Sequence, residues 1–241
     1  MLRFARTVLC SAAALALCLV ASPLVSKGQE VAIDSQGRAV ITAPPRASSP
    51  SLSPVKPDSP IPEGTATIYS NFGSGDSYNC CTGWAETGPT SMFAPPSYLQ
   101  AMAFTPTKGT YLLTQLDLAI GYLAFAGGTN GYKLELDADD HGQPGRRIAK
   151  WAVTGLPTFG TSSNSVETIK VRGLIILEKH HQYWLVPIVN SDEVAGWAWN
   201  SVSASGNGAY STDGGSTWTK LYYNAPSSPN GAFDVLGLKL F

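Results

Sequence analysis

Carboxylates are the side chains in this sequence whose type and spacing most suggest chemistry. Asp137, Asp139 and Asp140 precede Gly142, an arrangement that faintly resembles the start of a calcium-binding loop. Such a loop ends on a bidentate Glu, and the corresponding position here is Ile148. We therefore interpret the segment as a polar β-turn and predict no metal or cofactor, with calcium at these three aspartates as the alternative.

A second candidate is the octapeptide from Ser211 to Trp218, which reads STDGGSTW. It resembles the Asp-box of sialidases and other secreted glycan-processing proteins. In sialidase-like propellers the motif recurs from blade to blade and lies away from the catalytic centre. It occurs once here, in a stretch of about 175 residues that is too short for six blades of roughly 40 residues each.

The octapeptide by itself predicts a structural turn rather than a catalytic site. Asp213 can accept backbone N–H bonds within a β-hairpin, and Trp218 can cover the base of that hairpin. The predicted turn residues are Ser211, Asp213, Gly215, Thr217 and Trp218.

Other residues with catalytic potential form no recognisable constellation. The sequence contains no Gly-x-Ser-x-Gly, no His-Glu-x-x-His and no phosphate-cradling loop. Hydrolysis of a glycosidic bond needs two carboxylates, and nothing in the sequence distinguishes the available acids from solvated surface residues: Glu86, Glu135, Asp192 and Glu193. We therefore predict that the chain is not an enzyme.

Cys80 and Cys81 are the cysteines that remain if the N-terminal segment is removed on export. Thiols do not usually stay free in an oxidising compartment. The alternatives are a vicinal disulfide, an intermolecular bridge or two buried thiols. We favour the vicinal disulfide as a local brace for the loop before Trp84, although adjacent Cα atoms are closer than in most disulfides.

Trp197 and Trp199 project to the same side of one predicted strand, two residues apart. An outward-facing pair would make a flat platform for sugar rings, so these two residues are the candidate ligand-binding side chains. We favour an inward orientation because large aromatic residues are more often buried.

The composition is typical of an all-β extracellular protein. Charged residues make up 14% of the 241 residues, against roughly 25% in an average soluble domain. Gly is frequent, with 24 residues, and aromatic residues make up 10%. No cluster of Lys and Arg interleaves with aromatic residues, so we expect no nucleic-acid partner.

Residues 1–28 have the layout of a secretory signal peptide. Arg3 and Arg6 precede an apolar run from Thr7 to Ala21, which is shorter than a comfortable membrane span of about 20 residues. A short uncleaved anchor is the alternative. We predict cleavage and a mature chain without a membrane span, secreted or periplasmic. Removal of Arg3, Arg6 and Lys27 changes the formal net charge from −1 to −4.

Residues 29–64 and 65–241 differ in texture. The first range is rich in Pro and Ser and predicts a disordered linker, because it has few large apolar residues to offset its chain entropy. Val31–Thr42 within it could form a small hairpin or nothing. From Thr65 on, short runs alternate apolar and polar residues between Gly, Asn, Asp and Pro. This period-two pattern predicts an all-β domain over 65–241, a β-sandwich or jelly roll.

Several segments taken together resemble the choice-of-anchor domains, a family of secreted bacterial domains, and type R in particular. The resemblance covers residues 66–241 and is carried by IYSNFGSGDSYNCCTGW, AMAFTP, LTQLDLAIG, LELDADDHGQPGRRI, QYWLVP, WAWNS, AYSTDGGSTW and GAFDVLG. It implies an exported β-sandwich that is usually followed by a C-terminal anchoring signal, and it carries over no catalytic residues. The chain ends at GLKLF without such a signal, so we expect release to the periplasm or medium.

We therefore expect an exported, non-catalytic β-sandwich module with a structural or binding role at the cell envelope or outside the cell. Its partner would be an extracellular protein or a polysaccharide. The alternative is a carbohydrate-binding accessory module or a glycan-active enzyme, which the single Asp-box-like turn and the Trp-rich strands suggest.

Overall fold

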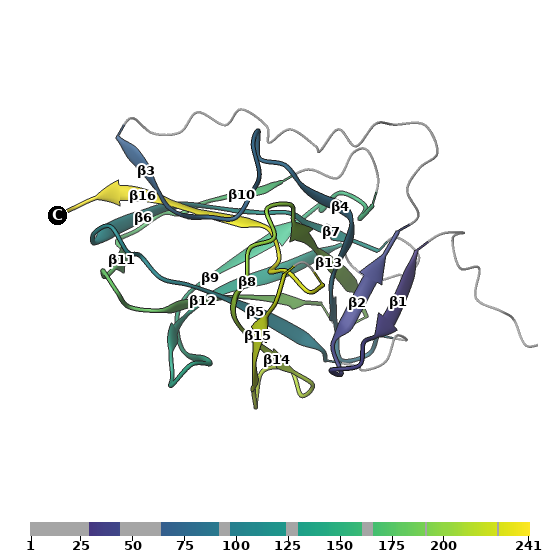
Figure 1. The fold of residues 1–241 in the computed structure, drawn as a ribbon. Coiled ribbons are helices and arrows are strands. Elements are labelled where there is room, and N and C mark those ends of the chain that lie inside the picture. Colours follow the sequence, from purple (N-terminus) through teal and green to yellow (C-terminus); the bar gives the residue numbers. More distant parts are fainter. Residues whose placement is uncertain are drawn as a thin grey trace, which may run out of the picture.

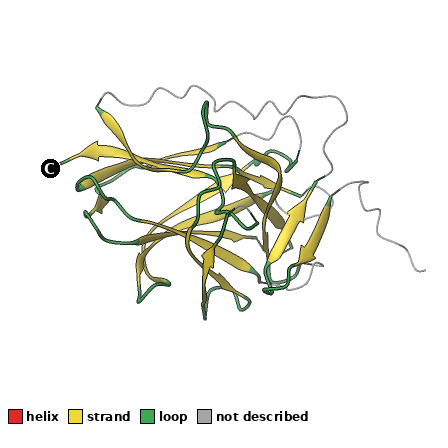
Figure 2. Cartoon of the chain, viewed as in Figure 1, coloured by secondary structure: helices red, strands yellow, loops and turns green. Residues whose placement is uncertain are grey.

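The protein is an all-β domain, as the alternating sequence pattern predicts. The computed structural model describes residues 29–43, 64–91, 97–123, 130–160, 166–190, 192–225 and 227–241. Within these ranges the chain forms strands and loops and no helix (Figure 2). Consequently the described part of the chain contains no helix long and apolar enough to cross a membrane. The predicted signal peptide and most of the predicted linker, residues 44–63, lie outside the described residues.

The strands form three antiparallel sheets, which are named here by position. The N-terminal sheet has the order β1 (Glu30–Ile33), β2 (Ala39–Thr42), β4 (Tyr78–Thr87), β13 (Val194–Asn200), β7 (Ile120–Tyr122). The C-terminal sheet has the order β10 (Glu167–Lys170), β6 (Tyr111–Leu118), β16 (Phe233–Lys239), β3 (Thr65–Ser70), with β11 (Ile176–Leu177) also on β6. The six-stranded sheet has the order β15 (Thr219–Tyr223), β14 (Gly206–Ser211), β5 (Leu99–Phe104), β12 (Tyr183–Val189), β8 (Gly131–Asp139), β9 (Pro144–Thr154).

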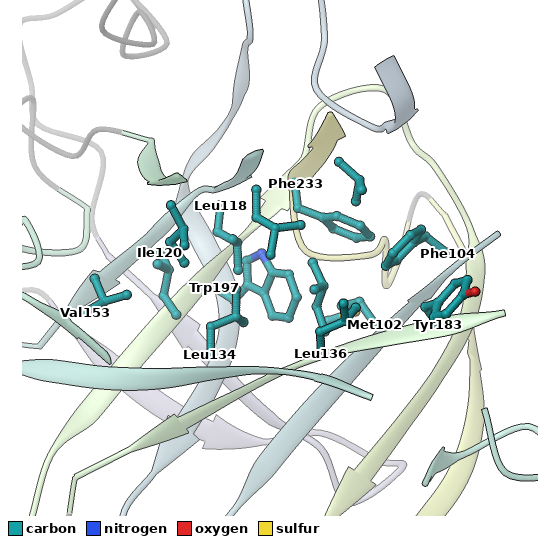
Figure 3. Close-up of a cluster of buried hydrophobic side chains, with 14 of the residues drawn as sticks. Met102, Phe104, Leu118, Ile120, Leu134, Leu136, Val153, Tyr183, Trp197 and Phe233 are labelled. Carbon is teal, nitrogen blue, oxygen red and sulfur yellow. The ribbon is translucent and has the colours of Figure 1, made fainter. Parts of the chain in front are cut away.

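The sheets pack as a sandwich around one main core. In Figure 1 the C-terminal sheet lies above the six-stranded sheet, and the N-terminal sheet closes one side. Trp197 of β13 lies in the middle of this core with its indole among apolar side chains from the other two sheets (Figure 3). The core residues around it include Met102, Leu118, Ile120, Leu134, Leu136 and Phe233. Packing of this kind supplies most of the stability of a sandwich.

The six-stranded sheet has two faces that we call inner and outer. The inner face lies against the main core and carries Leu134, Leu136 and Leu185, all fully buried. The outer face carries a smaller apolar cluster of Ala101, Ala103, Trp184, Val186 and Ala209, which is also buried. Because side chains alternate along a strand, the residues between the inner positions of β8 point to the outer face.

The N-terminal and C-terminal sheets meet at three buried alanines. The backbone N–H of Ala119 donates to the carbonyl of Ala232, that of Ala232 to Ala198, and that of Ala198 back to Ala119. All three residues have 0% exposure. Small side chains are needed at this junction, because the strands of the two sheets approach closely where β6 passes into β7.

Two strands that precede residue 65 pack against the domain. Strands β1 and β2 form a hairpin, and β2 pairs with β4 through Val40 and Trp84. Ala39 and Ile41 are fully buried, and the guanidinium of Arg38 lies 4.6 Å from the centroid of the Trp84 ring. Residues 30–42 thus form the small hairpin that is one alternative for Val31–Thr42, and burial of alternate residues attaches it to the domain.

Candidate functional site

The outer face of the six-stranded sheet carries a groove of about 550 Å³, within the range of small-molecule sites. Its floor comes from β5, β8 and β12, and its sides are two hairpin turns. One turn joins β8 to β9 and the other joins β14 to β15. The lining residues are Leu99, Glu135, Asp137, Asp140, Gln143, Pro144, Gly145, Arg147, Val186, Ile188, Gly214, Gly215, Ser216, Thr217 and Trp218.

The Asp-box-like octapeptide forms the β14–β15 turn and is held by its own side chains. The Asp213 carboxylate accepts hydrogen bonds from the backbone N–H of Thr217 at 2.9 Å and from its hydroxyl at 2.6 Å. The Ser211 hydroxyl donates to the same carboxylate at 2.7 Å and accepts the Gly215 N–H at 2.8 Å. These bonds, the Thr217 hydroxyl foremost, lower the pKa of Asp213 to about 2.

This turn places Trp218 over the outer face of the sheet. Gly214 and Gly215 have φ values of +72° and +90°, a conformation that glycine adopts without strain. The N–H of Gly214 donates to the carbonyl of Ser97 at 3.2 Å, which ties the turn to the start of β5. Trp218 packs against the outer apolar cluster and stays partly exposed at the groove.

The β8–β9 turn is a tight hairpin that forms the opposite side. His141 and Gly142 both have positive φ, +55° and +84°, the pattern of a type I′ turn. The N–H of Asp140 donates to the carbonyl of Gln143 at 2.8 Å. Lys220 of β15 donates through its Nζ to the carbonyl of His141, so the two hairpins that border the groove are joined.

Two carboxylates from β8 line the groove between the turns. Glu135 and Asp137 are 8% and 6% exposed. The Glu135 Oε1 accepts Arg147 Nη1 and Lys150 Nζ, each at 2.7 Å. Both cations come from β9, and Arg147 itself is half exposed at the groove.

Asp137 differs from Glu135 in its contacts. Its Oδ1 has no hydrogen-bond partner among the described residues. Burial, and next the negative charge of Glu135, raise the pKa of Asp137 to about 7, while Arg147 and Lys150 act in the opposite direction. Near neutral pH this carboxyl group therefore exchanges between its protonated and ionised forms.

Of the three aspartates considered for calcium, Asp137 and Asp140 line the groove. Asp139 instead accepts hydrogen bonds from Trp184 Nε1 at 2.8 Å and from Gln182 Nε2 at 2.6 Å. Asp140 contacts His141 Nδ1 at 2.6 Å. Over the described ranges there is no group of three or more His, Cys, Asp or Glu side chains that could hold a metal ion.

The tryptophan pair considered as a sugar platform lies against the main core. Trp197 is fully buried and donates its indole N–H to the carbonyl of Ala232 at 3.0 Å. Trp199 is partly exposed and packs against Trp84, with ring centroids 5.2 Å apart. Because Trp197 has no free face, the outward platform is not formed. The aromatic residue at the groove is Trp218 instead.

Cys80 and Cys81 form a vicinal disulfide in β4, the alternative that the sequence favours. The pairing of β4 with β13 is irregular here, because Tyr78 pairs with Asn200 while Gly83 pairs with Ala198. The carbonyl of Cys81 accepts the N–H of Ala43 at 2.8 Å, so this irregular segment also holds the end of β2.

Several acids that have the sequence pattern of surface residues are buried. Glu86 and Glu193 have 0% exposure. Burial raises the pKa of Glu86 well above its ordinary value and that of Glu193 to about 7. Glu86 accepts the N–H of Gln100 at 2.8 Å, and Glu193 accepts the N–H of Gly131 at 2.9 Å. Neither residue lines the groove, so both serve the interior of the domain.

Sequence reasoning missed Glu135 and Asp137 as a pair facing a groove. The alternation on β8 places them opposite Leu134 and Leu136, which is the signal that they share a face. What covers that face is the turn at Ser211–Trp218, about 80 residues further along the chain.

Comparison with protein-family models, with curated proteins and with solved structures finds no match to the chain.

Proposed function

We propose that the protein is an exported, non-catalytic β-sandwich module that binds a saccharide in the outer-face groove. The observation that carries this proposal is the position of Trp218. The Asp-box-like turn holds this aromatic ring at a groove that also contains buried carboxylates. Export is inferred from the signal-peptide layout of residues 1–28.

A sugar needs an apolar surface for its ring face and polar groups for its hydroxyls, and the groove offers both. Leu99, Val186, Ile188 and Trp218 supply apolar surface. Polar groups come from the two β8 carboxylates, Gln143, Arg147 and the backbone of the β14–β15 turn. Sites of this volume commonly combine an apolar lining with a few placed polar groups.

A glycan-hydrolysing enzyme is the second candidate, and the raised pKa of Asp137 beside Glu135 favours it. A protonated acid and an ionised carboxylate are the pair that glycoside hydrolysis uses. Against it, both groups come from one strand and Glu135 is engaged by two cations. Release of new reducing ends from bound oligosaccharides, lost in Asp137→Asn, would favour the enzyme over the binding module.

The proposal is tested by binding of the purified protein to an array of bacterial and plant polysaccharides. We expect a saturable hit that is lost in Trp218→Ala and kept in Trp151→Ala. Trp151 is a matched control because it is also partly exposed and lies on β9 outside the groove. A blank array, or a hit that Trp218→Ala leaves unchanged, would contradict the proposal and favour a structural or protein-binding role.

A further inference from the structure

We propose that the ligand of the groove is an amino sugar whose ammonium group binds beside Asp137. The inference rests on the proposed function and specifies its ligand class. Its basis is the distribution of charge among the lining residues. Three carboxylates line the groove, those of Glu135, Asp137 and Asp140, against the single guanidinium of Arg147.

The basic side chains near the floor are both committed to one oxygen. Arg147 Nη1 and Lys150 Nζ contact Glu135 Oε1 at 2.7 Å each. Asp137 is 94% buried on the same face and retains an Oδ1 without a hydrogen-bond partner among the described residues. A buried carboxylate oxygen in this state is costly, and a cation bound in the groove would remove that cost.

The remaining charges around Asp137 do not neutralise it. Asp140 and His141 stand on the β8–β9 turn and contact each other. On the β14–β15 hairpin, Asp213 is held by Ser211 and Thr217, and Lys220 donates to the carbonyl of His141. The groove-lining residues of β12 are Val186 and Ile188, which are apolar.

A bound ammonium group and a bound hydroxyl group should affect the protonation of Asp137 differently. The pKa of Asp137 is raised to about 7 by burial. A bound cation stabilises the ionised carboxylate and lowers that pKa, so binding below neutral pH, where Asp137 and the amine are both protonated, releases the Asp137 proton. Affinity should therefore rise with pH as Asp137 ionises, and fall again above neutral pH, where the amine of the sugar loses its own proton. A neutral sugar hydroxyl would not produce this coupling.

An amino sugar fits the rest of the groove better than a lysine side chain does. The partly exposed ring of Trp218 can cover a sugar ring, and Gln143 and the turn backbone offer partners for several hydroxyls. A lysine side chain carries an ammonium group but no hydroxyls, so it would leave those hydrogen-bonding partners unused. We therefore assign the site to a saccharide rather than to a basic peptide.

The experiment is isothermal titration calorimetry of the purified protein with three probes: a tetramer of β-1,4-linked glucosamine, its fully N-acetylated counterpart and tetralysine. We expect the glucosamine tetramer to bind at least about tenfold more tightly than the N-acetylated one. A close pair of opposite charges at a binding site commonly contributes at least this much to affinity. Repeating the titration at about pH 5.5, where both the amine and Asp137 are protonated before binding, in two buffers of different ionisation enthalpy should show net proton release.

Asp137→Asn should lose most of the preference and the proton release, whereas Asp192→Asn, at an exposed position outside the groove, should keep both. The wild-type proton release needs no variant and stands if Asp137→Asn folds poorly. Equal binding of both tetramers, lost in Trp218→Ala, would overturn the amino-sugar inference and leave the proposed function intact. Binding of neither tetramer would also overturn the inference, and tetralysine binding as tightly as the glucosamine tetramer would reassign the site to basic peptides.

Discussion

The six-stranded sheet buries side chains on both of its faces, but of different kinds. The inner face meets the other sheets through apolar residues such as Leu134 and Leu185, around Trp197. The outer face is covered by a hairpin turn and keeps the carboxylates of Glu135 and Asp137 below 10% exposure. Burial of apolar surface stabilises the fold, whereas burial of a carboxylate costs free energy unless it is paired.

This difference in buried side chains distinguishes residues that stabilise the domain, on the inner face, from residues that can bind a ligand, on the outer face. Glu135 forms ion pairs with two cations, whereas Asp137 keeps an Oδ1 with no hydrogen-bond partner in the described part of the chain. A buried carboxylate oxygen without a hydrogen bond lowers the stability of the folded protein. A ligand that binds this oxygen can offset the cost. If stability depends on the inner face and binding on the outer face, substitutions on the two faces should have different effects.

The largest effect is expected on the inner face. Trp197→Ala should lower the free energy of unfolding by about 3–5 kcal/mol, because it leaves a cavity in the main core and removes a buried hydrogen bond. Urea unfolding followed by circular dichroism measures this change. Trp218→Ala, which removes a partly exposed indole from the outer face, should cost clearly less; an equal cost would remove the distinction between the faces.

The second effect is a pH dependence of stability that belongs to Asp137. Its pKa is raised in the folded state, to about 7 from an ordinary value of 3.8, so the folded protein holds the proton more tightly than the unfolded chain. Stability should therefore fall as pH rises from about 4 to about 7, by an amount on the order of 4 kcal/mol from this group.

Thermal unfolding of wild type and Asp137→Asn across this pH range isolates the contribution of Asp137. Glu193, whose pKa is also raised to about 7, contributes equally to both proteins and cancels in the difference. A difference between the two proteins that does not change with pH would show that Asp137 ionises normally.

A smaller effect of opposite sign is expected from Asp213. Its pKa is lowered to about 2 in the folded state, chiefly by the Thr217 hydroxyl. Its contribution is complete above about pH 4 and is lost as pH falls through 2. Asp213→Ala should lower the melting temperature at pH 7 and weaken saccharide binding by loosening the turn under Trp218. The melting temperatures of the two proteins should converge towards pH 2, and a constant gap would contradict this account.

The smallest effect is expected from the vicinal disulfide. A bond between adjacent residues closes a very short loop, so its removal should cost only about 1 kcal/mol. The double variant Cys80→Ser/Cys81→Ser should therefore unfold slightly earlier in urea and bind saccharide as wild type does, because the disulfide lies in β4 and not at the groove. Mass spectrometry of the intact, alkylated protein checks that the two thiols are paired.

Features encoded by neighbouring residues could be predicted from the sequence. The alternation Tyr132, Leu134, Leu136 indicates which side of β8 is apolar, and the structure places these residues in the main core. The octapeptide at Ser211–Trp218 could be interpreted as a turn because its side-chain bonds join residues no more than four apart.

The groove could not be predicted, because it depends on contacts between distant segments. The outer side of β8 has the pattern of a solvent face, and the turn about 80 residues later, at Gly214–Trp218, encloses one side of the groove there. The N-terminal hairpin is a similar case. Arg38 reads as a surface residue in a Pro-rich region, yet it is 5% exposed and lies over Trp84 of a distant strand.

The central claim is that the outer-face groove binds a saccharide, and mapping the binding site by NMR tests it most directly. The strongest saccharide from the array would be titrated into ¹⁵N-labelled protein while backbone and indole N–H signals are followed. We predict the largest shifts at Gly214, Gly215 and the indole of Trp218, with smaller ones at Gln143 and Gly145. Shifts confined to residues outside the groove would contradict the claim.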